Sequence, residues 1–202
     1  MEAVKPLLVG VTGGIGAGKS TICRIFSIIK TPIYNSDLRA KWLMENDPDL
    51  VNQITNRIGI QSYNKGKINR EFLANEVFND RDKLTRLNDL VHPAVDRDFS
   101  TWIQGHLTNP YVIKEAALLF ETGTYKKMDF VINVQAGESA RIQRILKRDK
   151  FRTIVEIQSI IKNQFDDKKR LELANFQIIN DDSELVIPQV LKLHEYFLQI
   201  RS

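Results

Sequence analysis

The sequence predicts an α/β fold in which helices flank a parallel sheet. Short apolar runs alternate with longer segments of helical periodicity, and the apolar runs end in glycines or small polar residues. That alternation is typical of parallel strands joined by helical crossovers. The chain of 202 residues, 43% hydrophobic and 27% charged, is long enough for one substantial core. The predicted strands are Leu7–Val11, Pro32–Tyr34, Tyr111–Ala116, Phe130–Val134 and Phe176–Ile179.

Helical periodicity fills most of the remaining chain. In the first helix, Ile22, Phe26 and Ile29 fall on one face. A long, mostly helical region has a turn-rich break at Tyr63–Gly66, and Pro93 within it predicts a helix boundary, because the residue before a proline disfavours helix. The helical segment that ends near Phe165 leads into a charged stretch, Asp166–Arg170. The predicted helical segments are Lys19–Ile29, Leu38–Leu107, Glu138–Arg148, Val155–Phe165 and Leu185–Ile200.

Charge and composition limit the partners that we expect. The net charge of +4 and the isoelectric point near 9.1 suit an anionic ligand, but there is no dense Lys/Arg run that would indicate nucleic acid. No stretch approaches about 18 consecutive apolar residues, so no membrane span is expected. The single cysteine, Cys23, fits a cytoplasmic protein and is expected to be a small buried hydrophobe. A monomer is the default expectation.

The strongest signal is a glycine-rich loop between the first strand and the first helix. Gly13–Ser20 matches G-x-x-x-x-G-K-[ST] in full, which is the phosphate-binding loop of the P-loop NTPase fold. Backbone amides of such a loop converge on phosphate at a helix N-terminus. Lys19 is expected to reach the β- and γ-phosphates of ATP, and the Ser20 hydroxyl to hold Mg²⁺. The nucleotide-binding residues are therefore Gly13, Gly14, Ile15, Gly16, Ala17, Gly18, Lys19, Ser20 and Thr21.

This loop leaves three classes open: a small-molecule kinase, a GTPase-type switch, and an ATP-driven motor or DNA-acting ATPase. No Asn-Lys-x-Asp-like segment for reading guanine is present, and a motor usually needs a longer chain. A kinase needs a base on the acceptor side, an acceptor-binding insert and a lid that carries arginines. The sequence offers a candidate for each, which favours the kinase.

Each candidate residue also has a structural interpretation. Asp37 follows the second strand and either orients the acceptor hydroxyl or caps the next helix. Glu115 ends a strand and either holds Mg²⁺ through water or is simply solvated. His92 either contacts the acceptor or satisfies a helix end. Arg141, Arg144 and Arg148 share one helix face, which is either a lid over the phosphates or a solvated surface.

The ordered set of motifs resembles the dephospho-CoA kinase family over nearly the whole chain. Val11–Thr21 resembles the opening of that family, and Asn35-Ser36-Asp37 stands where the family has Asp-x-Asp. Asn35 replaces the first aspartate of this pair, and Ala117 replaces the proline usual in the later segment. The other segments that carry the resemblance are Leu87–Pro93, Glu115–Glu121, Gln143-Arg144, Arg148-Asp149 and Gln164.

The resemblance implies transfer of the γ-phosphate of ATP to the ribose 3′-hydroxyl of dephospho-CoA, the last step of coenzyme A synthesis. It implies that Asp37 is the catalytic carboxylate, that Lys19, Arg144 and Arg148 are catalytic, and that Asp37 and His92 bind the acceptor. We expect one P-loop kinase domain: a core of residues 1–37, 108–137 and 170–202, an acceptor-binding helical insert at 38–107, and a helical lid at 138–169. A kinase for another small acceptor and a nucleotide-binding regulator with little turnover remain alternatives.

Overall fold

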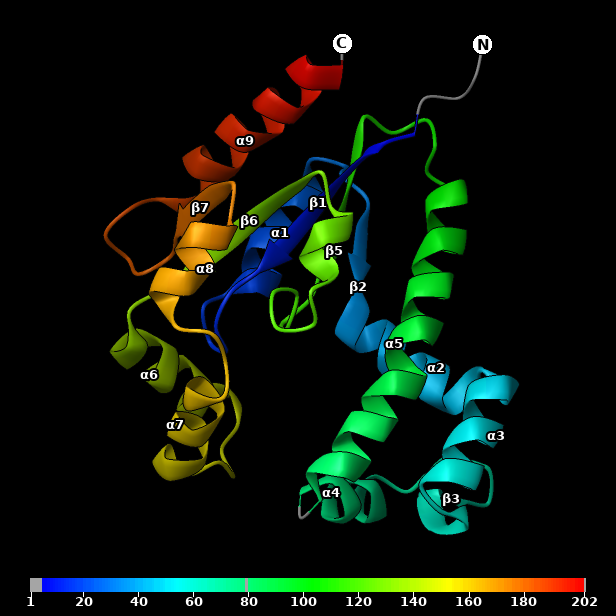
Figure 1. Cartoon of the computed structure of the whole chain (residues 1–202). Helices are drawn as coiled ribbons and strands as arrows, with labels where there is room; N and C mark the ends of the chain where they lie inside the picture. The colour runs from blue at the N-terminus through cyan, green and yellow to red at the C-terminus, as the bar shows by residue number, and fades with distance from the viewer. Residues whose placement is uncertain (1–4, 79, 202) are drawn as a thin grey trace. The chain divides into compact units, whose positions relative to one another are not determined.

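The central element of the fold is a parallel sheet. The structure, a computed structural model, describes residues 5–78 and 80–201. Among these residues, five strands form the sheet in the order β2-β5-β1-β6-β7, and every neighbouring pair is parallel (Figure 1). The predicted parallel α/β architecture is therefore confirmed. The strands are β1 (Leu7–Thr12), β2 (Ile33–Asn35), β5 (Tyr111–Glu115), β6 (Phe130–Gln135) and β7 (Phe176–Ile179).

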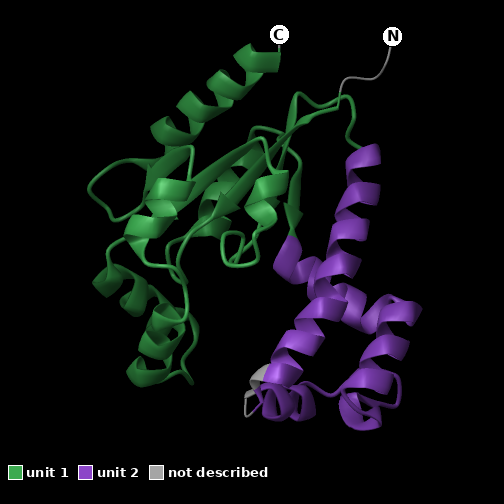
Figure 2. Cartoon of the chain, viewed as in Figure 1, with its two compact units in different colours: residues 1–35, 106–202 green, residues 36–105 purple. Residues whose placement is uncertain are grey.

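The chain forms two compact units (Figure 2). Unit 1 comprises residues 1–35 and 106–202 and contains the parallel sheet. Unit 2 comprises residues 36–105 and is mainly helical. The helices of unit 1 are α1 (Lys19–Ile28), the 3₁₀ turn η2 (Thr124–Lys127), α6 (Glu138–Arg148), α7 (Ile154–Lys162), α8 (Asp167–Leu173) and α9 (Val186–Arg201).

The sheet of unit 1 is covered on both faces. On one face, Phe26 of α1 and Phe197 of α9 are fully buried in the main core cluster together with Ile132 of β6. On the other face, Leu119 and Phe120 form a second cluster with Val131, against which Leu173 of α8 packs. Strands buried on both faces favour continuous apolar runs, which is why the strands were readable from the sequence.

Unit 2 is built around its longest helix, α5, which packs on α2, α3 and α4. Asp47 caps α3, because its carboxylate accepts hydrogen bonds from the amides of Asp49 and Leu50, and Asp80 caps α5 in the same way. The turn-rich break at Tyr63–Gly66 is a short antiparallel hairpin. The elements are α2 (Ser36–Asn46), α3 (Pro48–Arg57), η1 (Ile60–Ser62), β3 (Tyr63–Asn64), β4 (Lys67–Ile68), α4 (Arg70–Phe78) and α5 (Arg81–Gln104).

One local prediction was wrong. Pro93 does not mark a helix boundary, since α5 continues through it to Gln104. The proline removes one backbone donor, but the helix still buries Ala94, Val95 and Phe99, and that packing offsets the loss. The charged stretch Asp166–Arg170 begins a helix, because Asp166 caps α8 by accepting a hydrogen bond from the Lys169 amide.

No helix in the described ranges, 5–78 and 80–201, has the length and apolar character needed to cross a bilayer.

Candidate active site

The phosphate-binding loop connects β1 to α1, as the sequence predicts. Gly18 is the N-cap of α1 with a left-handed φ of 95°, so the helix starts at Lys19 and its first amides face the loop. A Cβ at Gly13 would lie 2.3 Å from the carbonyl oxygen of Val134 on β6, so the loop approaches the next strand too closely for a side chain. The Lys19 ammonium donates hydrogen bonds to the carbonyl oxygens of Gly13 (2.9 Å) and Gly14 (3.2 Å). The lysine, the amides and the helix terminus thus form an arrangement that is suited to an anion.

Three side chains from distant segments hold the tip of this loop. The Ile15 amide donates to Gln164 Oε1 at 2.8 Å, and Arg141 Nε donates to the Ile15 carbonyl oxygen at 2.9 Å. The Asn180 side-chain amide donates to the Ala17 carbonyl oxygen at 2.8 Å. Helix α6, the segment before α8 and the loop after β7 therefore all contact the phosphate-binding loop.

Arg141 is buried, although it lies on a helix whose arginines could have been a solvated surface. Its exposed fraction is 2%, and the neighbouring buried Arg170 shares the carboxylate of Asp167 with it. Burial lowers the pKa of the Arg141 guanidinium, whereas Asp167 raises it. Solvation is therefore the wrong interpretation for Arg141, because its side chain is buried and contacts the loop.

The two arginines predicted to be catalytic have different surroundings. Arg144 Nη1 donates to the Asn180 carbonyl oxygen at 2.7 Å, and Asn180 is the residue that binds Ala17 of the loop. Arg148 is 63% exposed and makes two hydrogen bonds of 2.9 Å to the carboxylate of Asp149. These bonds raise the pKa of Arg148 and lower that of Asp149. Arg144 is thus linked to the loop through Asn180, whereas Arg148 is held by its neighbour.

Glu115 is buried beside the first turn of α1 and is not a solvated acid at a strand end. Its exposed fraction is 6%; its Oε1 accepts a hydrogen bond from Ser20 Oγ at 3.2 Å and its Oε2 accepts one from Asn35 Nδ2 at 2.7 Å. Cys23, one turn after Ser20, also contacts it: burial raises the pKa of the Cys23 thiol, and the adjacent Glu115 carboxylate raises it further. Cys23 is buried, as predicted.

The donor set of Ser20 and Glu115 fits Mg²⁺. A hydroxyl and a carboxylate oxygen lie within hydrogen-bond distance of each other at the N-terminal turn of α1, next to the loop. Magnesium prefers such hard oxygen ligands and usually completes its shell with water and phosphate oxygens. Both residues therefore can hold a metal bound to nucleotide phosphates at this position.

Asp37 and His92 belong to unit 2 and are both exposed. Helix α2 begins at Ser36, so Asp37 lies in its first turn and does not cap it; that structural interpretation is wrong. His92 lies in the middle of α5, so it does not satisfy a helix end. Each side chain is accessible to a ligand.

Comparison with known proteins identifies the family. Residues 7–185 match the family model described as dephospho-CoA kinase. The chain is 35% identical over 207 residues to a dephospho-CoA kinase of Chlorobium chlorochromatii, covering 98% of this chain and 97% of that protein. It is 33% identical over 189 residues to one of Porphyromonas gingivalis, covering 94% and 93%.

The chain belongs to the dephospho-CoA kinase family.

Solved structures agree with the fold. A crystal structure of a Thermus thermophilus protein superposes with a TM-score of 0.83 at 27% identity, covering 96% of this chain and 98% of that one. A dephospho-CoA kinase from Campylobacter jejuni superposes with a TM-score of 0.71 at 23% identity, covering 96% and 98%. The second likeness supports the fold alone.

The sequence alone does not reveal all the side chains that hydrogen-bond to the phosphate-binding loop. Gln164 is indicated only by the family resemblance. Its contact with Ile15 cannot be read from local sequence, because the two residues are separated by most of the chain. The sequence around Asn180 predicts a turn, but its position at the carboxyl end of a predicted strand is a usable signal, because such ends meet at one edge of a parallel sheet. The spacing of Arg141, Arg144 and Arg148 predicts one shared helix face, but nothing in it distinguishes Arg141 from the other two.

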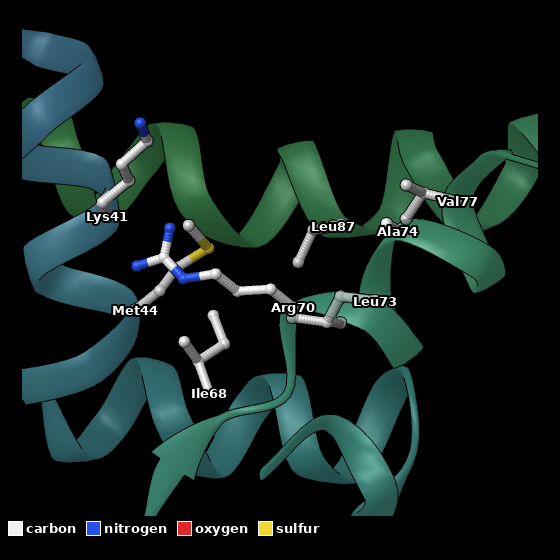
Figure 3. A pocket seen from close by; sticks show the side chains of 8 residues that line it. All are labelled: Lys41, Met44, Ile68, Arg70, Leu73, Ala74, Val77 and Leu87. Carbon is white, nitrogen blue, oxygen red and sulfur yellow. The ribbon is translucent and has the colours of Figure 1, made fainter. Parts of the chain in front are cut away.

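Unit 2 of this family member contains an apolar cavity of about 260 Å³. Two cationic residues, Lys41 and Arg70, are among its lining residues, and Figure 3 shows the Arg70 side chain extending across the cavity toward Met44. Arg70 also pairs with Glu45 at 2.9 Å. The apolar part of the lining consists of Met44, Ile68, Leu73, Ala74, Val77 and Leu87.

Proposed function

We propose that this chain transfers the γ-phosphate of ATP to the ribose 3′-hydroxyl of dephospho-CoA. Membership of the family supports the choice of acceptor. The observation that carries the reaction type is the complete phosphate-binding loop with Ser20 bonded to the buried Glu115, because both a loop for triphosphate and a pair of metal-binding oxygens are needed for phosphoryl transfer. We also propose that the protein acts as a monomer and that it acts in the cytoplasm.

The loop and its lysine bind the triphosphate in this proposal. Amides at the start of α1 and the Lys19 ammonium stabilise the negative charge that develops on the β–γ bridge. When ATP enters, the hydrogen bonds of Lys19 to Gly13 and Gly14 are exchanged for bonds to phosphate oxygens. Mg²⁺ held by Ser20 and, directly or through water, by Glu115 would offset charge on the β- and γ-phosphates.

Asp37 acts on the acceptor. Its carboxylate accepts the proton of the 3′-hydroxyl, whose oxygen forms a bond to the γ-phosphorus while the bond from that phosphorus to the β–γ bridging oxygen breaks and ADP leaves. Its exposure and its position at the start of α2 support this role, since a general base must be accessible. Arg144 and Arg148 supply positive charge to the transferring group, and His92 contacts the acceptor.

Unit 2 binds the rest of the acceptor in this proposal. The apolar cavity suits the long flexible pantetheine arm, and Lys41 and Arg70 suit the diphosphate of dephospho-CoA. A pocket with mostly apolar walls and a few charges is typical of sites for small molecules of this mixed character.

An acceptor panel tests the proposal. Release of ADP from ATP and Mg²⁺ is measured with dephospho-CoA, and separately with nucleosides, nucleotides and sugar acids. We expect turnover with dephospho-CoA at least about 100-fold above that with the other acceptors, because binding energy from the remote arm contributes to catalysis. Preferential turnover of another acceptor would replace dephospho-CoA in the proposal. Nucleotide binding without acceptor-dependent turnover would indicate a regulator.

A further inference from the structure

Asn35 and Glu115 are side by side because of the strand register. Strand β2 pairs with β5 in parallel, and Asn35 is the register partner of Glu115 at the carboxyl end of both strands. The short distance from Asn35 Nδ2 to Glu115 Oε2, 2.7 Å, is therefore set by the sheet. Backbone pairing fixes both Cα positions, so a change at residue 35 acts directly on this carboxylate.

The two carboxylate oxygens of Glu115 have different partners. Oε2 is occupied by Asn35, and Oε1 faces the Ser20 hydroxyl at 3.2 Å. A carboxylate held on one oxygen cannot rotate freely, so its other oxygen stays directed at Ser20. An amide also donates this bond without adding charge. The pair formed by residues 35 and 115 therefore carries one carboxylate, where an aspartate at residue 35 would have given two.

We propose that Asn35 is a positioning residue that sets the affinity of the site for a divalent cation: it aims Glu115 at Ser20 and adds no carboxylate of its own beside Glu115. This inference rests on the proposed Mg²⁺ site. It concerns the hydrogen bond and the charge at residue 35, and it assigns Asn35 no contact with the reacting atoms.

Two substitutions separate the hydrogen bond from the charge. Asn35→Ala removes the donor and adds no charge, so Glu115 loses its orientation and cation binding weakens by about 10-fold, as expected when the outer partner of a metal ligand is lost. Asn35→Asp removes the donor at nearly constant size and adds a carboxylate, so cation binding tightens by a similar factor, because a second negative charge attracts the metal. The two variants thus shift in opposite directions.

The measurement is the binding of Mn²⁺ by electron paramagnetic resonance, with a non-hydrolysable ATP analogue present. Wild type is compared with the two variants, and thermal melts verify that each variant is folded. The Mg²⁺ concentration that gives half-maximal ADP release with dephospho-CoA should follow the same order. Asn46→Ala is the matched control, because it removes an exposed asparagine whose amide donates to a backbone carbonyl within α2.

Opposite shifts of the two variants support the inference. Equal affinities in all three proteins, or shifts in the same direction, would overturn it, since Asn35 would then only fill space. If Asn35→Ala does not fold, the near-isosteric Asn35→Asp decides, and unchanged Mn²⁺ affinity in that variant rejects the inference. Failure of the proposed function is seen separately, as wild-type protein that binds Mn²⁺ and nucleotide but shows no turnover with dephospho-CoA.

Discussion

The guanidinium of Arg141 occupies the space in which Gly14 would carry a side chain. A Cβ at Gly14 would lie 2.4 Å from both Cζ and Nη2 of Arg141 and 2.9 Å from Nη1. Gly14 is not among the glycines with positive φ, so its backbone conformation does not require glycine. The requirement is for space, and it is imposed by a buried side chain from α6 that also binds Ile15.

Gly14→Ala should therefore displace Arg141 and loosen the phosphate-binding loop. We expect a loss of about 1–3 kcal/mol in the free energy of unfolding, which is typical of overpacking a buried site. Affinity for ATP should fall as well, because the hydrogen bond from Arg141 to Ile15 would be strained. A thermal melt and a nucleotide titration measure the two effects.

The control is Gly105→Ala. A Cβ there would meet its nearest atom, the Trp102 carbonyl oxygen, at an ordinary distance of 3.6 Å, so its stability should stay close to that of wild type. Equal stability of Gly14→Ala and Gly105→Ala would contradict the packing of Arg141 on Gly14.

Lys19→Ala should abolish phosphoryl transfer. The substitution removes the cation that neutralises the β- and γ-phosphates. Folding should survive, since Lys19 is not part of the buried core. Acceptor-dependent ADP release and a thermal melt are the measurements, with exposed Lys147→Ala on α6 as the control. Near-normal turnover in a folded Lys19→Ala protein would contradict the proposed function.

Arg144→Ala and Arg148→Ala should affect different kinetic constants. Arg148 is largely exposed and paired with Asp149, so its loss should leave the affinity for ATP nearly unchanged. Its loss should lower kcat, because about 2–4 kcal/mol of transition-state stabilisation is lost when a residue that acts on the transferring group is removed. Arg144 holds Asn180 against the loop, so its loss should also raise the KM for ATP. Steady-state kinetics distinguish the two effects. An unchanged kcat in Arg148→Ala would show that Arg148 is a solvated surface residue with no role in phosphoryl transfer.

Asp37→Asn should lower the rate by about 10²-fold or more without destabilising the protein. The change keeps the size of an exposed side chain and removes the charge that accepts the hydroxyl proton. Asp47→Asn is the matched control in the same unit, because asparagine caps a helix as well as aspartate does. ADP release with dephospho-CoA and a thermal melt are compared for both variants. Wild-type turnover in Asp37→Asn would exclude Asp37 as the base.

Ala74→Trp should fill the cavity of unit 2 and raise the KM for dephospho-CoA severalfold. Ala74 is exposed on α4 and lines the cavity, so the indole can enter it without disturbing the buried core. The KM for ATP should not change. Ala74→Ser, which leaves the cavity open, is the control. If the KM for the acceptor is the same in Ala74→Trp as in wild type, the arm of dephospho-CoA binds elsewhere.

The sequence predicted best what is determined locally. The phosphate-binding loop, α6 at Glu138–Arg148 and β7 at Phe176–Ile179 depend on nearby glycines and on apolar periodicity. The burial of Glu115 could not be read from its strand, because the charged neighbour Lys114 interrupts the apolar run and is itself only 3% exposed. Its partners, Ser20 and Asn35, come from other parts of the chain. The helix boundary predicted at Pro93 is absent for a related reason: burial along α5 outweighs a local preference against helix.

The burial of Cys23 makes this protein convenient for spectroscopy. It is the single cysteine of the 202 residues, its exposed fraction is 3%, and its thiol favours the protonated, unreactive form. A cysteine introduced at an exposed position would therefore react with maleimide reagents while Cys23 does not, so the native cysteine need not be replaced first. Two such sites, one in α6 and one in α2, would accept a donor and an acceptor fluorophore, and their energy transfer would report the separation of the two units during turnover.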